Sequence, residues 1–257
     1  MFHLFVAEFK RSWIQLLRYP TEVISAIVVT TIVFYGLFLS ARYVAGPGVQ
    51  FGDRMESIII GYALWSLAMF IMADITGGLQ REAQTGTLEQ IFISPFGAPK
   101  VFLVRALAGL TIQVALNLVI LVILMVLTGT RLAFPPMLLL PFVSILMGVY
   151  GLAFILGSIA LRVKQVQQLL GICQFVFLFL LTVPVESWAG SFKFFAMLLP
   201  MVPGAGLLRD LMARDQTLNV GLWAIALVNG FVYLALGLLL FRYAERETKR
   251  QGKLAGY

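Results

Sequence analysis

Long apolar runs alternate with short polar stretches along the whole chain. A helix needs about 20 mostly apolar residues, with a range of about 17–25, to cross the hydrocarbon core of a bilayer. Six segments reach that length, and these predicted spans cover residues 23–41, 57–79, 101–128, 135–161, 169–185 and 218–241. The pattern therefore predicts an all-α integral membrane protein, in which residues 1–257 form a single domain with six transmembrane helices.

Composition and charge agree with this prediction. The chain is 60% hydrophobic and 12% charged, about half the charge of an average soluble domain. About two thirds of its 19 Lys and Arg residues fall in the tails and loops on the side of the two termini. Because cytoplasmic loops are enriched in these residues, we expect a multi-pass protein of the plasma or inner membrane with both termini in the cytoplasm. The net charge of +7 follows from this asymmetry, so we expect no nucleic-acid partner.

The residues before the first span, 1–20, predict an amphipathic helix. Apolar side chains recur at spacings of three and four, with charged side chains largely between them. The apolar positions are Phe2, Phe5, Val6, Phe9, Trp13, Leu16 and Leu17. A mere extension of the first span would carry Lys10 and Arg11 into lipid, which is costly. We therefore expect this helix to lie in the cytoplasmic interface of the membrane.

Three further stretches lie outside the spans. Residues 80–100 carry Gly86 between two threonines and end at prolines, which predicts a short capped helix; a partner-docking helix and an ordinary solvated connection both fit. Residues 186–217 are apolar, but each piece is too short to span. We expect two short extracellular helices there, in a re-entrant or interfacial hairpin interrupted at 200–206. Residues 242–257 form a basic cytoplasmic tail that is expected to anchor the topology.

Few side chains are suited to catalysis or to metal binding. Cys173 is the only cysteine and His3 the only histidine, which excludes an internal disulfide and a thiolate metal cluster. The sequence also lacks the GxxxxGK[ST] phosphate-binding loop. We therefore expect that the chain by itself is not an enzyme and holds no metal or cofactor.

The loop at 80–100 also carries a specific motif. Its segment 82–95, EAQTGTLEQIFISP, resembles the glutamate, glycine-threonine-leucine-glutamate and serine-proline motif of type-2 ABC exporter permeases. After the fifth span, PVESW at 184–188, Leu-Pro at 199–200 and GLLRDL at 206–211 are similar to the family's proline-rich turn, short helices and arginine segment. The six spans and the N-terminal interface helix match as well. The Met-Val pair that follows Pro200 departs from the family's more usual Leu or Thr followed by Tyr.

This resemblance implies a transporter made of two kinds of subunit. Two copies of the permease, most simply a homodimer, pair in the membrane, and two copies of a separate ABC ATPase bind beneath them. The ATPase binds ATP and Mg²⁺, so this chain is expected to contain no nucleotide site. The family's coupling helix, which contacts the ATPase, corresponds to Gly86, Thr87, Leu88, Glu89, Gln90 and Ile91.

The fifth span carries a mixed face that we assign to the cargo path. Steps of three and four residues connect Gln168, Gly171, Phe175, Phe179, Thr182 and Glu186. Polar groups that face lipid are unfavourable, so this face should look toward a neighbouring helix or toward the dimer axis. The resemblance places the first, second and fifth spans around the path and favours the axis. The opposite, aliphatic side consists of Ile172, Val176, Leu180 and Val183.

Other polar residues of the spans favour structural roles. Gln113, Asn117 and Asn229 are expected to pack through interhelical hydrogen bonds, and glycines of the fourth and sixth spans to allow close helix contacts. The ionisable side chains lie near span ends, at Glu22, Asp74 and Arg105. Ion-coupled carriers commonly expose such groups near the bilayer midplane, so their absence there favours an external energy source.

We therefore expect the permease subunit of an ATP-driven exporter. The chain has 21 Phe against 4 Trp and 8 Tyr, and sugars stack best on Trp and Tyr. An amphipathic lipid-like or drug-like cargo is therefore favoured over a lipid-linked polysaccharide. The alternative class is an ATPase-independent secondary transporter or flippase, and a purely structural membrane protein is the third. Co-purification with an ATPase would separate these classes.

Overall fold

The computed structural model describes residues 2–45, 52–84, 98–161, 166–187 and 191–251. Within these ranges the chain is helical and contains no strand. The elements are α1 (Phe2–Arg18), α2 (Pro20–Ala45), α3 (Gly52–Gln84), α5 (Ala98–Thr128), η1 (Pro136–Leu138), α6 (Leu139–Ala160), α7 (Val166–Thr182), η2 (Val185–Ser187), α8 (Ser191–Leu198), α9 (Val202–Met212) and α10 (Val220–Gln251). The all-α fold class is thereby confirmed.

Five of the predicted spans are confirmed as helices long and apolar enough to cross a membrane. They cover Val23–Ser40, Arg54–Glu82, Lys100–Thr128, Pro136–Ala160 and Val220–Thr248.

The fifth predicted span, 169–185, is represented by a shorter helix. α7 ends at Thr182, before Pro184, whose ring disfavours a continued α-helix, and η2 follows. The 17 residues of α7 have a length of about 26 Å at about 1.5 Å per residue, near the lower limit for a span. The sixth crossing therefore stays a prediction.

Residues 186–217 contain two short helices, as expected. α8 and α9 are separated by residues 199–201, so the expected break at 200–206 is wrong in its extent. Pro203 stands in the first turn of α9, where its missing N–H removes no helical hydrogen bond. Gly204 is retained inside the helix because a Cβ there would clash with a side chain of α6. A re-entrant or interfacial position of this hairpin stays a prediction.

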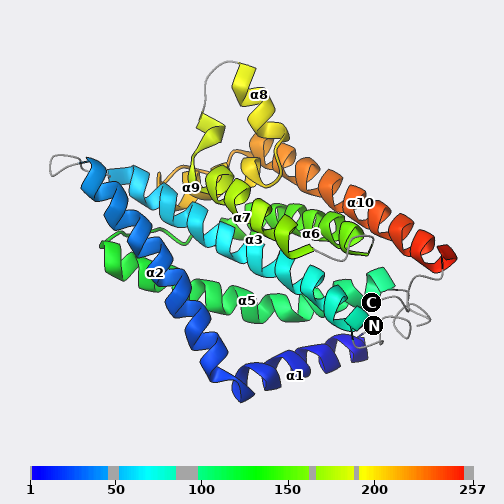
Figure 1. The fold of residues 1–257 in the computed structure, drawn as a ribbon. Helices are drawn as coiled ribbons and strands as arrows, with labels where there is room; N and C mark the ends of the chain where they lie inside the picture. The colour runs from blue at the N-terminus through cyan, green and yellow to red at the C-terminus, as the bar shows by residue number, and fades with distance from the viewer. Residues whose placement is uncertain (1, 46–51, 85–97, 162–165, 188–190, 252–257) are drawn as a thin grey trace.

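α3 lies at the centre of the bundle and packs against α5, α6, α7 and α9 (Figure 1). Its residues Ile59, Tyr62 and Met72 are fully buried. α2, by contrast, leans across α3 and α5 and exposes most of its large apolar side chains. The chain thus has a packed centre and one long helix that is attached at its side.

The buried amide of Asn117 and the partly buried amide of Asn229 fix helices to each other, and both had been predicted to pack. Asn117 of α5 donates to the Ala63 carbonyl of α3 at 3.0 Å and to the Ser66 hydroxyl at 2.6 Å. Asn229 of α10 donates to the carbonyls of residues 197–199 at the end of α8. Its amide thereby supplies partners that a helix end otherwise lacks. The structural interpretation of these two residues is confirmed.

Glycines allow α6 and α10 to touch backbone to backbone. A Cβ on Gly237 would overlap the Gly151 carbonyl, and one on Gly230 would overlap the Ser144 carbonyl. The predicted close packing of the fourth and sixth spans is confirmed. A similar contact that the sequence analysis missed joins α3 to α7, where Gly61 faces a backbone carbonyl of α7.

We expect Gly237→Ala to lower the free energy of unfolding by about 1–3 kcal/mol, the usual cost of overpacking. The added methyl group would meet backbone atoms of α6 that cannot move aside. Gly36→Ala in α2 is the matched control, because no atom lies within 4 Å of its Cβ position and alanine favours helix. Thermal unfolding of both variants in detergent measures the difference. Equal midpoints would contradict the close contact of α6 and α10.

Candidate functional site

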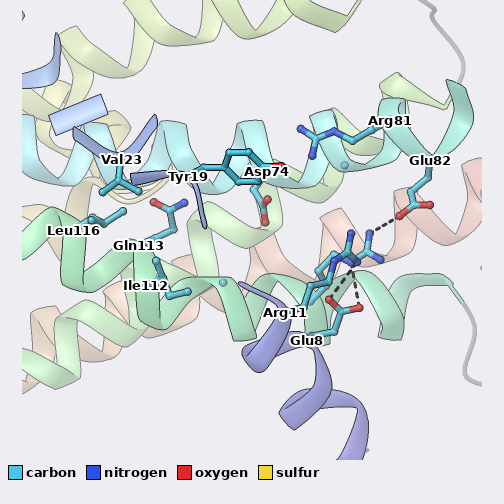
Figure 2. A pocket seen from close by; sticks show the side chains of 13 residues that line it. Glu8, Arg11, Tyr19, Val23, Asp74, Arg81, Glu82, Ile112, Gln113 and Leu116 are labelled. Carbon is cyan, nitrogen blue, oxygen red and sulfur yellow. Dashed lines mark hydrogen bonds and ion pairs between the residues drawn. The ribbon is translucent and has the colours of Figure 1, made fainter. Parts of the chain in front are cut away.

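A polar cavity of about 290 Å³ lies between α1, the start of α2, α3 and α5 (Figure 2). Its charged lining consists of Glu8, Arg11, Asp74, Arg81, Glu82 and Arg105. The other side chains of the lining are Tyr19, Val23, Ile112, Gln113 and Leu116, with Gly78 and Gly109 between them. Charged, polar and apolar groups thus meet in one space, although they come from distant parts of the sequence.

Arg105 of α5 is the centre of an ion-pair cluster in this cavity. Its Nη1 donates to Glu82 Oε1 of α3 at 2.8 Å, and its Nε lies 3.5 Å from Glu8 Oε1 of α1. Glu8 also pairs with Arg11 at 3.6 Å. Arg105 is 22% exposed, so the cluster is partly shielded from solvent, unlike fully exposed ion pairs, which contribute only about 0–1 kcal/mol. It therefore holds α1 against α3 and α5.

The cluster lies beside the segment to which the coupling role was assigned. α3 ends at Gln84, two residues after Glu82, and α5 begins at Ala98, seven residues before Arg105. The assigned residues Gly86, Thr87, Leu88, Glu89, Gln90 and Ile91 lie outside the described residues. Their role stays a prediction, while the helices on both sides of them are joined through Arg105 and Glu82.

The residues assigned to the cargo path form two groups. Phe175 and Phe179 are 73% and 61% exposed, Gln168 is exposed, and Gly171 has open space before it. Phe175 and Phe179 do not pack inside the subunit, and this part of the mixed face points outward. Whether it lines a path stays a prediction.

The other end of the mixed face, at Thr182 and Glu186, is turned into the subunit. The Thr182 hydroxyl donates to the Leu178 carbonyl at 2.5 Å, which is a bond within α7. Glu186 belongs to η2 and pairs with Arg209 of α9. Because the α-helix ends at Thr182, the spacing that connected Glu186 to Phe175 does not continue, and Glu186 is not part of the exposed face.

A third face of α7 packs on α3. Phe177 and Leu181 are buried, and Trp65 Nε1 of α3 donates to the Gln174 carbonyl at 2.9 Å. On the predicted aliphatic side, Ile172 and Val176 are exposed. The packing surface thus lies between the two faces that the sequence distinguished.

Arg209 ties α9 to three other elements. Its guanidinium group is fully buried, and its Nη1 donates to Glu186 Oε1 at 2.6 Å. Nη2 donates to the Leu181 carbonyl, and Nε lies 3.4 Å from the Ser57 carbonyl. These contacts connect α9 with η2, the end of α7 and the first turns of α3.

Sequence reasoning missed the cavity. Gln113, expected to pack, lines it instead, and its Oε1 is buried with no hydrogen-bond partner among the described residues. Glu8 is one of the charged side chains that fall between the apolar positions of the predicted N-terminal helix, and no partner was predicted for it. The available signal was that Glu8, Glu82 and Arg105 all fall at the same predicted membrane boundary, with opposite charges on different helices.

The helical fold and the long apolar helices define a multi-pass membrane protein. A model of the ABC-2 type transporter family matches residues 3–213, and the chain belongs to this family. It is therefore a permease of an ABC transporter, and permeases of this family partner with an ABC ATPase. A search of the curated proteins gave no match.

We expect Arg209→Met to lower the free energy of unfolding by about 3–5 kcal/mol, because the Glu186 carboxylate would stay buried without its partner. Adding Glu186→Gln should recover part of this loss, since no unpaired charge then remains. Arg214→Met is the control, because it removes a partly exposed partner of Asp210 and should cost about 0–1 kcal/mol. The thermal unfolding midpoints of these variants test the role of Arg209, and an unchanged midpoint for Arg209→Met would disprove it.

Proposed function

We propose that the chain forms the membrane pathway of an ATP-driven exporter and is moved by a separate ABC ATPase through residues 86–91. The observation that carries this proposal is the cluster around Arg105. It joins α1 to the two helices that flank the coupling segment, so a displacement of that segment is passed to three helices at once. ATP and Mg²⁺ are bound by the ATPase, and this chain supplies neither a nucleotide site nor a catalytic group.

We place the cargo path between two copies of the chain. α2 exposes Ile24, Val28 and Ile32, and α7 exposes Phe175 and Phe179. In a two-fold interface the same surface serves both subunits, and these two helices offer such a surface. The Gln168, Gly171, Phe175 and Phe179 positions then face the partner copy, while Thr182 is turned into the subunit and Glu186 acts through Arg209.

An amphipathic lipid-like or drug-like molecule is the cargo that this arrangement favours. The exposed side of α7 is aromatic and apolar, with a polar side chain at Gln168. Lipid-linked polysaccharide is the alternative cargo. With both termini in the cytoplasm, the cavity lies at the cytoplasmic side, and the α8–α9 hairpin lies at the outer side.

An ATPase-independent flippase is the second candidate function. Asp74 supports it, because this carboxylate of α3 lines the cavity and lies outside the ion-pair cluster. Transport in proteoliposomes with and without the ATPase separates the two functions. Transport by the chain alone would favour the flippase.

Leu88→Ala combined with Glu89→Ala should abolish ATP-driven transport and leave the chain folded. The two changes remove an apolar and an acidic contact of the expected coupling helix with the ATPase. Export from vesicles that contain both subunits measures the effect, and the thermal unfolding midpoint monitors folding. Arg250→Ala, on the exposed end of α10, is the control and should transport normally. Normal transport by the double variant would show that the coupling assignment is wrong.

Phe175→Cys should form a disulfide with the same residue of a second copy. The experiment uses a Cys173→Ser background, because Cys173 is the only natural cysteine. Val228→Cys is the matched control, since Val228 of α10 is 61% exposed and lies on a helix that is not assigned to the interface. Crosslinking in native membranes, read on a denaturing gel, should be strong for Phe175→Cys and weak for Val228→Cys. Equal yields for the two variants would remove α7 from the interface.

A further inference from the structure

The part of the cavity beyond the ion-pair cluster is lined by hydrogen-bond acceptors. Asp74 projects from α3 over Gly109 of α5, where a Cβ would lie 3.8 Å from Asp74 Oδ2. Gln113 follows one turn later on α5, and its Oε1 has no hydrogen-bond partner among the described residues. Figure 2 shows both side chains pointing into the space between α3 and α5. Since the Gln113 oxygen is a buried acceptor without a donor, which is unfavourable, this place is suited to a ligand that donates hydrogen bonds.

The charges of the lining balance as a whole, but Asp74 forms no ion pair among the described residues, and this carboxylate can accept a cationic donor. Three carboxylates and three guanidinium groups line the cavity, but Glu8 and Glu82 are already engaged by Arg105. Asp74 lies outside that cluster, and Tyr19 adds an aromatic ring to the same lining. A carboxylate, an amide oxygen and an aromatic ring together bind ammonium groups, through charge-assisted hydrogen bonds and cation–π attraction.

The order of groups along the cavity selects the kind of amphiphile. Toward the middle of α5 the lining consists of Val23, Ile112 and Leu116. Gln113 lies beside these apolar side chains, Asp74 comes next, and Arg81 and Arg11 come last (Figure 2). A long-chain amine fits this order, because its chain is joined directly to its ammonium group. Phosphatidylethanolamine does not, since its phosphate lies between chain and ammonium and would reach the carboxylate first.

We propose that this cavity binds a lipophilic amine, with its ammonium group held by Asp74 and Gln113 beside Tyr19 and its alkyl chain directed toward Leu116. The inference rests on the proposed function, because it names a class of amphipathic molecule that the transporter takes up. At about 290 Å³ the cavity is at the lower limit of drug-sized pockets, which hold about 300–1,000 Å³. It accommodates the head and the first part of the chain, and the remainder extends along the exposed apolar side of α2.

The test follows the thermal unfolding midpoint of the full chain in dodecyl maltoside micelles as dodecylamine is added. A ligand that binds only the folded protein raises this midpoint with its concentration. Asp74→Asn keeps the shape and removes the charge, and it should require about tenfold more dodecylamine for the same rise, or about 1.4 kcal/mol. Gln113→Leu should require about threefold more, because one weaker acceptor is lost. Asp215→Asn, which changes an exposed carboxylate far along the chain, should respond as the unchanged protein does.

Two further ligands identify the group that is recognised. Dodecanol has the same chain without the charge, and a twelve-carbon lysophosphatidylethanolamine carries a phosphate before its ammonium group. Neither should raise the midpoint in a way that depends on Asp74. Equal responses of the unchanged protein and Asp74→Asn to dodecylamine, or an equally large Asp74-dependent response to the lysolipid, would overturn the proposal. If Asp74→Asn does not fold, Gln113→Leu and the comparison of dodecylamine with dodecanol decide the question.

Co-purification with the ATPase, measured on the same variants, separates this proposal from the proposed function. A chain that pairs with its ATPase but shows no Asp74-dependent binding of dodecylamine would overturn the amine site alone. Asp74-dependent binding by a chain that transports without an ATPase would overturn the ATP-driven exporter alone.

Discussion

Lipid hydrocarbon offers no hydrogen-bond partner, so a polar side chain between the helices of this bundle must find its partner in another helix. Asn117 finds it in α3, Asn229 finds it at the end of α8, and Arg209 finds it in η2, at the end of α7 and in the first turns of α3. Because each of these groups would be costly to bury alone, the helices they join are held at defined rotations. The glycine contacts of α6 with α10, and of α3 with α7, then close the remaining space.

Different parts of the chain are held by contacts of different kinds. Where α6 meets α10 and where α3 meets α7, backbone touches backbone at glycines, which leaves no room for small displacements. α1 is joined to α5 through charged side chains that water partly reaches, and such pairs exchange partners at little cost. A displacement that begins beside the cavity is therefore expected to reach α1, α3 and α5 through the ion-pair cluster and to leave the contact of α6 with α10 unchanged. Permeases of this family partner with an ABC ATPase, which can act on the helices joined by ion pairs while the glycine contacts stay fixed.

Hydropathy and length are local properties, and they predicted six spans, of which five are confirmed, the N-terminal helix and the two short helices near 200. The rotation of a helix about its axis and its depth in the bundle depend on the other helices, so they could not be predicted from the sequence. Gln113 and Asn117 are four residues apart on one helix, yet Asn117 meets α3 whereas Gln113 meets a cavity. The pairing of Glu8 with Arg105 joins residues that are far apart in sequence. The mixed face of the fifth span was extended to Glu186 on the assumption of one continuous helix, but the α-helix ends at Thr182, before Pro184.

α2 touches the centre of the bundle near its own midpoint. Phe34 packs edge-on against Tyr62, with ring centroids 4.9 Å apart, and the Tyr62 hydroxyl donates to the Thr30 carbonyl at 2.8 Å. At its lower end α2 continues through Pro20 from α1. A rigid helix that is held near its middle rotates about that contact, so its two ends move in opposite directions. If α1 draws the Pro20 end of α2 away from α5, the Ala45 end moves toward the other end of the bundle. A single rigid helix would thus prevent the two sides of the membrane from being open together.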